Sequence, residues 1–210
     1  YLFEGNWFDN GGPSASASCF FKNFILRNNI FYCNNSNLSA SGFYNSISVI
    51  FDHNLFYGPS NGTTPVFGNT CRNLLLTNNI FVRRTATSNI TNSVFQKNIT
   101  YLAGTTNPWD TLSNSGSGNF ANQSPQLLDS IAVNNGVNNP LLNFTISTGP
   151  GNNSATDSTD IGLLYHPAGS LNWTNSRMSR LPFVYSMNIS NPNIPAGGSL
   201  NVQVEARKNN

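Results

Sequence analysis

Charged side chains are scarce in this chain of 210 residues. Asp, Glu, Lys and Arg together make up 9% of it, and the formal net charge is +2. The ten Lys and Arg residues are scattered, so the sequence lacks the basic strip with which nucleic-acid-binding proteins contact phosphates. No apolar run approaches the roughly 20 residues that a membrane-spanning helix requires. Aromatic residues nevertheless reach 12%, so we expect a packed core in a protein with neither a nucleic-acid partner nor a membrane-spanning segment.

Cysteine and histidine are also few. The three cysteines, Cys19, Cys33 and Cys71, cannot all pair within one chain. Cys19 and Cys71 fall near each other when the repeats described below are aligned, so a disulfide is possible there, although we favour buried thiols. There is no CxxC motif, and His53 and His166 lie far from any cysteine in the sequence. The sequence therefore predicts no metal site, and the absence of a glycine-rich phosphate loop predicts no nucleotide cofactor.

What the chain does contain is a recurring phrase. An apolar run is followed by two or three polar residues that end in Asn, and then by a second apolar or aromatic run. Copies cover residues 24–32, 49–57 and 74–82, with a weaker copy at 94–99 and a partial one at 1–8. The closing residues of the four later copies are Asn29, Asn54, Asn79 and Asn98, and the first two intervals are 25 residues long. A fixed period of this size indicates a stacked repeat.

Each copy is typical of a strand, a tight Asn corner and a second strand, because Asn tolerates the left-handed conformation that a sharp corner requires. Parallel strands of successive coils lie about 4.8 Å apart. The four closing Asn residues are therefore predicted to form a ladder of hydrogen-bonded amides. Apolar columns of inward-facing residues are predicted in the same way. Their members are Ile25, Ile50 and Leu75 in the first column, and Ile30, Leu55 and Ile80 in the second.

This pattern resembles the right-handed parallel β-helix family, the fold of pectate lyases, polygalacturonases and many surface proteins. The resemblance covers residues 2–101 by repeat and continues less regularly to about residue 165. It implies an all-β fold with a domain of coils over residues 1–165, of which the coils after about residue 101 are irregular and terminal. The phrase Asp157–Gly162 resembles one that closes β-helix domains in secreted bacterial proteins of the Bacteroidetes type. Because residue 1 stands inside a repeat, we expect the C-terminal part of a longer secreted or surface protein.

The tail, residues 166–210, has a different periodicity. Apolar residues alternate with polar ones over 181–189 and again over 200–206, and a turn-rich connection lies between them. Two half-buried strands are predicted, and we expect them to form a hairpin-like cap that covers the end of the coils. A secretion or anchoring signal is the alternative interpretation of this segment.

The sequence offers few residues for acid–base catalysis, since it contains only eight carboxylates. The β-helix hydrolases that attack pectin carry an Asp-Asp pair with His-Gly and Arg-x-Lys phrases, and the lyases carry a cluster of calcium-binding acids. Neither pattern is present here. The remaining catalytic candidates are Asp52 and His53, with His53 as a general base oriented by Asp52. We favour a solvated corner instead, in which Asp52 forms an exposed ion pair with Arg27 from the neighbouring coil.

Sugar binding is a further hypothesis, because Tyr44, Trp109 and Trp173 could stack on sugar rings, although packing explains each of them equally well. Three functions remain open. The first, which we favour, is a non-catalytic extracellular or cell-surface domain for adhesion, binding or structure, with a polysaccharide or another surface protein as partner. The second is the C-terminal portion of a polysaccharide lyase or glycoside hydrolase whose active site lies upstream. The third is a glycan-binding module.

Overall fold

The computed structural model describes residues 1–9, 21–33, 43–59, 62–63, 65–68, 70–87, 90–109, 113–164, 183–189 and 202–207. The predictions for Cys19, His166 and Trp173 lie outside these residues. The chain forms two compact units, Tyr1–Thr174 and Asn175–Asn210.

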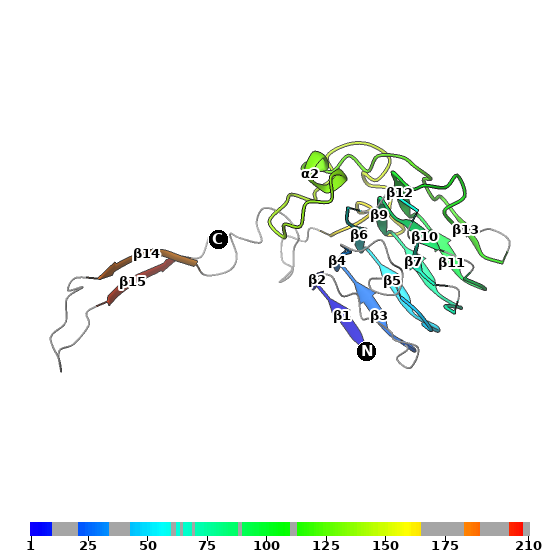
Figure 1. The fold of residues 1–210 in the computed structure, drawn as a ribbon, viewed down its shortest axis with the longest axis horizontal. Coiled ribbons are helices and arrows are strands. Elements are labelled where there is room, and N and C mark those ends of the chain that lie inside the picture. The colour runs from blue at the N-terminus through cyan, green and yellow to red at the C-terminus, as the bar shows by residue number, and fades with distance from the viewer. Residues whose placement is uncertain are drawn as a thin grey trace. The chain divides into compact units, whose positions relative to one another are not determined.

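The first unit is the predicted parallel β-solenoid (Figure 1). One face is a six-stranded parallel sheet, here called sheet A, in the order β1, β3, β5, β8, β11, β13. Its strands are β1 (Leu2–Glu4), β3 (Ile25–Arg27), β5 (Ile50–Asp52), β8 (Leu75–Thr77), β11 (Val94–Gln96) and β13 (Ser115–Ser117).

A second face, sheet B, has five parallel strands in the order β12, β9, β6, β4, β2. They are β2 (Trp7–Asp9), β4 (Ile30–Tyr32), β6 (Leu55–Tyr57), β9 (Ile80–Val82) and β12 (Ile99–Tyr101). A third, smaller face pairs β7 (Pro65–Phe67) with β10 (Thr85–Thr87). Every pairing within these sheets is parallel, as stacking of successive coils requires.

The middle residue of each three-residue strand points into the solenoid. In sheet A the inward column is Leu26, Phe51, Leu76 and Phe95, all buried. In sheet B, Phe31, Phe56 and Phe81 stack face to face with ring centroids 4.8 Å apart. Together they form the main part of one apolar core, in which each coil depends on its neighbours for burial.

The predicted column of Ile25, Ile50 and Leu75 exists, but its predicted direction is wrong. These residues pair in register, yet they are the first residues of their strands and face outward. Ile25 is exposed, and Ile50 and Leu75 are only half-buried. The error arises because the first two residues of each of these strands are both apolar, so alternation alone does not distinguish the inward side.

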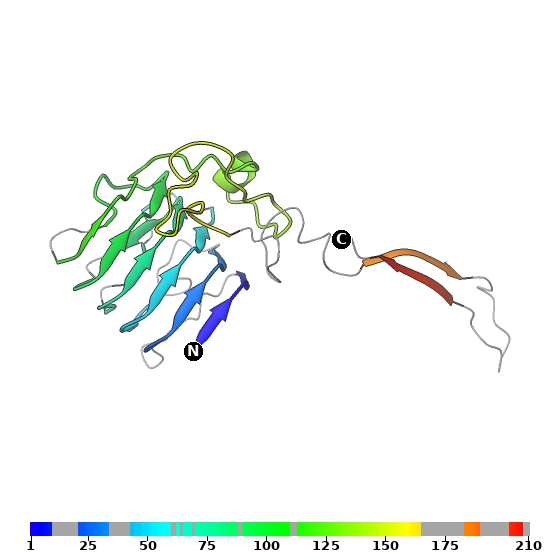
Figure 2. The same cartoon turned by 180° about the vertical axis from the view of Figure 1, so that it is seen from behind.

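A second apolar core lies outside sheet B. The predicted column of Ile30, Leu55 and Ile80 exists, but it faces outward from the solenoid and not inward. It is buried by residues 120–164, which we call the strap. The strap contributes, among others, Leu127, Val133, Phe144, Ile146 and Ile161 to this core. In both views the yellow-green chain with α2 (Ser130–Asn134) passes along the sheet B side (Figures 1 and 2).

The strap corrects the prediction of irregular terminal coils after residue 101. The regular coils continue one step further than predicted, because β13 pairs with β11 and Phe120 bridges to Ile99. The chain then folds back over sheet B instead of adding further coils. Tyr32 Oη donates to the Gly136 carbonyl at 2.9 Å, and Asn138 Nδ2 donates to both carboxylate oxygens of Asp9 at 3.1 Å. The strap therefore reaches the first coil.

The second unit contains an antiparallel pair, β14 (Phe183–Ile189) and β15 (Val202–Arg207). This confirms the two predicted tail strands and their antiparallel pairing. The Val202 and Val204 side chains are exposed. That the hairpin covers the end of the coils stays a prediction.

Candidate functional site

The closing asparagines of the repeat form the predicted ladder. Each side chain lies above the next, and Asn29, Asn54, Asn79 and Asn98 are all 0% exposed. Asn54 shows the pattern. Its Oδ1 accepts the backbone N–H of Asn29 at 3.0 Å and the Asn29 side-chain amide at 3.1 Å. Its Nδ2 donates to the Leu26 carbonyl at 2.8 Å and to Asn79 Oδ1 at 2.9 Å. All the hydrogen-bonding capacity of the buried amide is used.

The ladder extends beyond the predicted members in both directions. Asn6 donates its backbone N–H and its amide to Asn29 Oδ1 at 2.9 and 3.1 Å. At the other end, Asn98 donates in the same two ways to Asn119 Oδ1 at 2.9 and 3.1 Å. The intervals along the ladder are 23, 25, 25, 19 and 21 residues. Coil length therefore varies, while the ladder position is kept.

The left-handed corner residue is the one before each ladder asparagine, which corrects the predicted Asn corner. Asn28, His53, Asn78 and Lys97 have φ values of 53°, 53°, 59° and 57°. These residues stand level in successive coils, and we call them the corner column. Their side chains point away from the solenoid interior. The ladder asparagine itself turns inward, where it is sealed from water.

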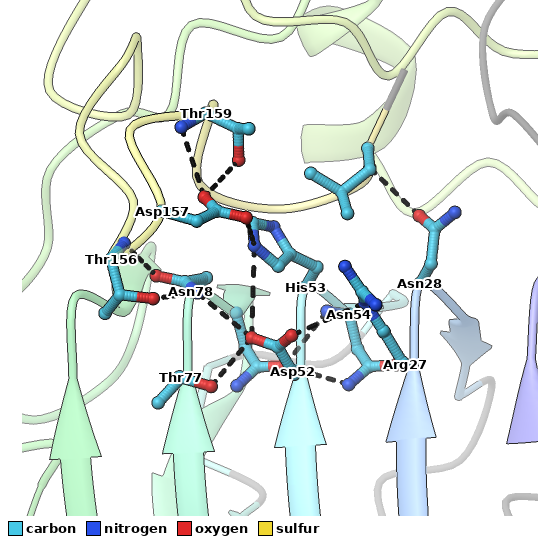
Figure 3. A network of polar contacts seen from close by, with 12 residues as sticks. Arg27, Asn28, Asp52, His53, Asn54, Thr77, Asn78, Thr156, Asp157 and Thr159 are labelled. Carbon is cyan, nitrogen blue, oxygen red and sulfur yellow. Dashed lines mark hydrogen bonds and ion pairs between the residues drawn. The ribbon is translucent and has the colours of Figure 1, made fainter. Parts of the chain in front are cut away.

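Three members of the corner column bind the strap (Figure 3). Asn78 Oδ1 accepts the Thr156 N–H at 2.8 Å, and its Nδ2 donates to Thr156 Oγ1 at 2.8 Å. The Gly162 N–H donates to the Asn78 carbonyl at 2.7 Å. Asn28 Oδ1 accepts the Leu164 N–H at 2.9 Å. Successive coils thus hold successive points of one strap segment.

His53 is the central member of the column and is 0% exposed. Its Nδ1 lies 2.9 Å from the Gly162 carbonyl oxygen. A carbonyl only accepts, so Nδ1 carries a proton. Its Nε2 lies 3.5 Å from Asp157 Oδ2 and 3.9 Å from Asp52 Oδ1, and it makes no hydrogen bond in the structure. The ring is therefore enclosed between a strap carbonyl and two carboxylates.

Asp52 belongs to sheet A and is tied to the neighbouring coils. Its Oδ1 accepts hydrogen bonds from Thr77 Oγ1 at 2.7 Å and from Asn78 Nδ2 at 3.0 Å. Arg27 Nε lies 3.6 Å from its Oδ2. The strand register places Arg27, Asp52 and Thr77 level with one another in successive coils, as the predicted pairing of Asp52 with Arg27 requires. The Arg27 side chain is 42% exposed and that of Asp52 22% exposed, so solvent screens this ion pair and it contributes less than about 1 kcal/mol.

Asp157 comes from the strap and completes the cluster. Burial alone would raise the pKa of the Asp157 carboxyl, but hydrogen bonds from Thr159 and the nearby His53 ring hold the pKa below its ordinary value. Thr159 donates its hydroxyl and its backbone N–H to Asp157 Oδ1 at 2.6 and 3.1 Å. The carboxylate is thus fixed as an anion beside His53, although its side chain is 45% exposed.

The expected solvated corner is wrong for His53, which the strap covers completely. A general base must come within hydrogen-bonding reach of the proton that it removes. With the strap in place, Gly162 and Asp157 occupy the two sides of the ring on which its nitrogens lie. The geometry positions His53 to hold the strap.

The predicted sugar-binding aromatics have different environments. Trp109 is 9% exposed and packs in the interior core, with its ring centroid 5.5 Å from that of Phe95. Trp109 also lines a pocket of about 260 Å³ at the β13 end of sheet A, together with Phe95 and residues 114–119. Tyr44 is half-buried. Trp173 lies outside the part of the chain that the structure describes.

Cys33 and Cys71 are both buried, and Cys71 is a free thiol that donates to the Phe43 carbonyl at 3.3 Å. The favoured prediction of a buried thiol is thus confirmed for Cys71. Within the described residues, no group of three or more His, Cys, Asp and Glu side chains could hold a metal ion. The described residues contain one α-helix, α2, which has 5 residues. No helix in that part of the chain is long and apolar enough to cross a membrane.

Comparison with protein-family models, with curated proteins and with solved structures found no match for this chain.

Sequence reasoning missed Asp157 as the partner of His53. The two residues are separated by more than half of the solenoid unit, and the strap that joins them has no repeat to place it. One signal was available in the sequence. The positions before Asn29, Asn54 and Asn79 carry Asn28, His53 and Asn78, which are all polar side chains able to reach outward.

Proposed function

We propose that this chain is a non-catalytic β-helix domain of an extracellular or cell-surface protein, with a structural, adhesive or binding role. One observation carries the proposal. In the pair with the most catalytic character, His53 is sealed beneath the strap and holds it to the coils, while Asp52 beside it is bound to the neighbouring coil. The polar groups at the corner thus stabilise the fold and are not presented to a substrate.

A rigid ladder with loops of varying length is a suitable scaffold for binding. Coil length changes between 19 and 25 residues while the ladder stays in register, so the connections between strands can vary in sequence and size. The low charge and the abundance of Asn, Ser, Thr and Gly fit a secreted or surface protein. The phrase Asp157–Gly162 resembles one from secreted bacterial proteins of the Bacteroidetes type, and we propose that kind of source. On this proposal the partner is a polysaccharide or another surface protein.

An activity screen tests the non-catalytic assignment. The chain is incubated with pectins and other polysaccharides, and reducing ends and unsaturated products are measured. We expect neither product above the level of a buffer blank. The proposal is overturned if the wild-type chain is active and the substitution His53→Gln abolishes that activity. Activity found only in a longer form of the protein would favour the alternative of a lyase or hydrolase whose active site lies upstream.

A glycan-binding module is the second candidate, and the pocket beside Trp109 favours it. The pocket is lined by Trp109 and by Ser115 and Ser117, and aromatic rings and hydroxyls commonly contact sugars. Asn114 and Asn119 also line it, but their side-chain amides are hydrogen-bonded within the coils. A glycan array probes the wild-type chain and Ser117→Tyr, which fills the pocket from an exposed position. The control is Ser147→Tyr, at an exposed position on the strap. This function is supported if the wild-type chain and Ser147→Tyr bind a glycan and Ser117→Tyr does not.

A further inference from the structure

One segment of the strap, residues 155–164, is bound to the coils much as a peptide is bound to a receptor. We call this segment the latch. Its contacts follow the corner column in order, because Thr156 is held by Asn78, Gly162 by His53 and Leu164 by Asn28. The latch therefore runs toward the first coil, and three successive coils each hold it through the same structural position.

Apolar packing also depends on close approach of the latch. Ile161 is buried in the second core against the outward side chains of sheet B. Gly162 has φ of 99°, and a Cβ at this position would lie 2.4 Å from Ile80 Cδ1. Only glycine allows the backbone to come this near to the sheet while adopting that conformation.

Charge is concentrated at the centre of the latch. The groups facing His53 are Asp52 from β5 and Asp157 from the latch, and Arg27 from β3 balances Asp52 from its far side. The only contact between the latch and the coils that involves a negative charge is therefore that of Asp157 with His53, among the described residues. The remaining latch contacts named above are neutral hydrogen bonds and apolar packing.

We propose that residues 155–164 form an acid-sensitive latch, which opens as a unit while the coils remain folded when the Asp157 carboxylate is neutralised. Opening removes the carbonyl of Gly162 and the carboxylate of Asp157 from His53. It also uncovers the outward apolar residues of sheet B nearest the latch, such as Ile80. The latch is a conformational device that controls access to His53 and to this surface.

The direction of the pH effect follows from Asp157. Burial raises the Asp157 pKa, but hydrogen bonds from Thr159 and the nearby His53 ring outweigh it and hold the pKa below its ordinary value of 3.8. Thr159 belongs to the latch itself, so the contribution of His53 is the part that is lost when the latch opens. A carboxyl group whose pKa is depressed by folding stabilises the folded form fully at a pH above that ordinary value. This stabilisation is lost as the pH falls through the depressed value. Acid therefore opens the latch, and alkali does not open it through this group.

The stability of the coils has no comparable dependence on acid pH. The Asn ladder is built of neutral amides, and the tyrosines and thiols of the two apolar cores stay neutral as the pH is lowered. The hydrogen bonds of Asn54 and Asn79 therefore report on the coils, whereas those of Thr156 and Gly162 report on the latch. Two sets of amide signals in one protein separate local opening from unfolding.

Amide NMR of the full chain tests the proposal as the pH is lowered from neutral into the range in which Asp157 titrates. We expect the Thr156 and Gly162 signals to shift together in acid, while those of Asn54 and Asn79 keep their positions. In Asp157→Asn we expect hydrogen exchange at Gly162 to be roughly tenfold faster at neutral pH, because a charged contact is lost. The acid shift of the latch signals should then disappear.

Two comparisons keep the test decisive. Glu4→Gln neutralises a carboxylate on β1 and should leave the acid transition of the latch intact. His53→Gln retains an N–H that can donate to Gly162 but removes the ring, and it should speed exchange at Gly162 without changing exchange at Asn54. The proposal is overturned if latch and ladder signals change in a single transition. It is also overturned if Asp157→Asn keeps the wild-type acid shift.

Discussion

At the scale of single residues, the ladder asparagine is the most constrained element of the repeat. The side chain of Asn54 accepts two hydrogen bonds and donates two, and none of these groups is exposed to water. No other residue type offers the same donors and acceptors at the same length. This explains why the phrase could be read from the sequence, because the ladder position varies so little among the coils.

Replacement of a central ladder residue should therefore be costly. Asn54→Ala removes the acceptor of the buried Asn29 backbone N–H and the amide that donates to the Leu26 carbonyl. The side chains of Asn29 and Asn79 lose one hydrogen bond each but keep others. Each buried polar group left unpaired costs on the order of 1–3 kcal/mol. We expect a clear fall in the urea midpoint of unfolding. Asn6→Ala at the exposed end of the ladder is the matched control and should change the midpoint little. Equal losses in the two variants would contradict this account.

The corner column shows where residue-level prediction stops. Asn at the corner was expected from its tolerance of left-handed geometry, and the structure places that geometry one residue earlier, at Asn28, His53 and Asn78. In two of the three copies both positions are Asn, so the sequence did not distinguish them. His53 marks the difference, since it takes the left-handed position while Asn54 joins the ladder.

At the scale of elements, strand positions and register followed from the repeat, whereas the inward sides of sheets A and B did not. In sheet B all three residues of β4, β6 and β9 are buried, because the interior core covers one face and the strap covers the other. Strands buried on both faces read as continuous apolar runs. The sequence showed that run, and what covers the outer face could not be read from it.

Phe144 tests the contribution of the strap to packing. Its ring lies 6.0 Å from that of Tyr57 and 6.5 Å from that of Trp7, and it is buried in the second core. Phe144→Ala should leave a cavity there and cost about 3–5 kcal/mol. We expect faster proteolysis within the strap. Leu141→Ala, at an exposed strap position, is the control and should be cleaved at the wild-type rate.

Tyr57 gives the strap a response to alkali. Burial raises the Tyr57 pKa above its ordinary value of 10.0, and its hydroxyl donates to the Val137 carbonyl at 3.1 Å. A raised folded-state pKa stabilises the fold fully below that ordinary value, and this contribution is lost as the pH rises above it.

Tyr57→Phe should accordingly lower stability at neutral pH by about 1 kcal/mol through loss of the hydrogen bond. It should also flatten the decline of stability above pH 10. The free energy of unfolding, measured in urea at several alkaline pH values, checks both effects. Tyr101→Phe, at a half-buried position outside this contact, should keep the wild-type decline. A decline of the wild-type size in Tyr57→Phe would contradict the assignment.

At the scale of the whole molecule, the solenoid could be predicted because each coil repeats the same local chemistry. The strap could not, because it makes contacts over more than 100 residues without a period of its own, as Tyr32 with Gly136 and His53 with Gly162 show. The candidate site shares this limit. Asp52 and Arg27 were brought together by the repeat, and Asp157 required the strap.

Removal of one coil tests how far the repeat is modular. Deleting residues 54–78 takes out one full interval and joins His53 to Asn79, so the ladder can close again. We expect the shortened chain to keep parallel strands by circular dichroism. Its strap, however, should become sensitive to protease, because one anchor is lost and the others move closer together. If the strap of the shortened chain resists protease as well as that of the wild type, the strap does not need its anchors at the wild-type spacing.

The length of the strap also restricts the number of coils in the solenoid. It is fastened near the first coil through Asn138 and Asp9, and again at three corners whose separation is set by the rise of the coils. A solenoid can in principle gain or lose coils freely. A strap that is bound to several coils along its side, however, has the right length for only one number of coils. Any lengthening of this protein within the strapped region therefore has to lengthen the strap by the same measure.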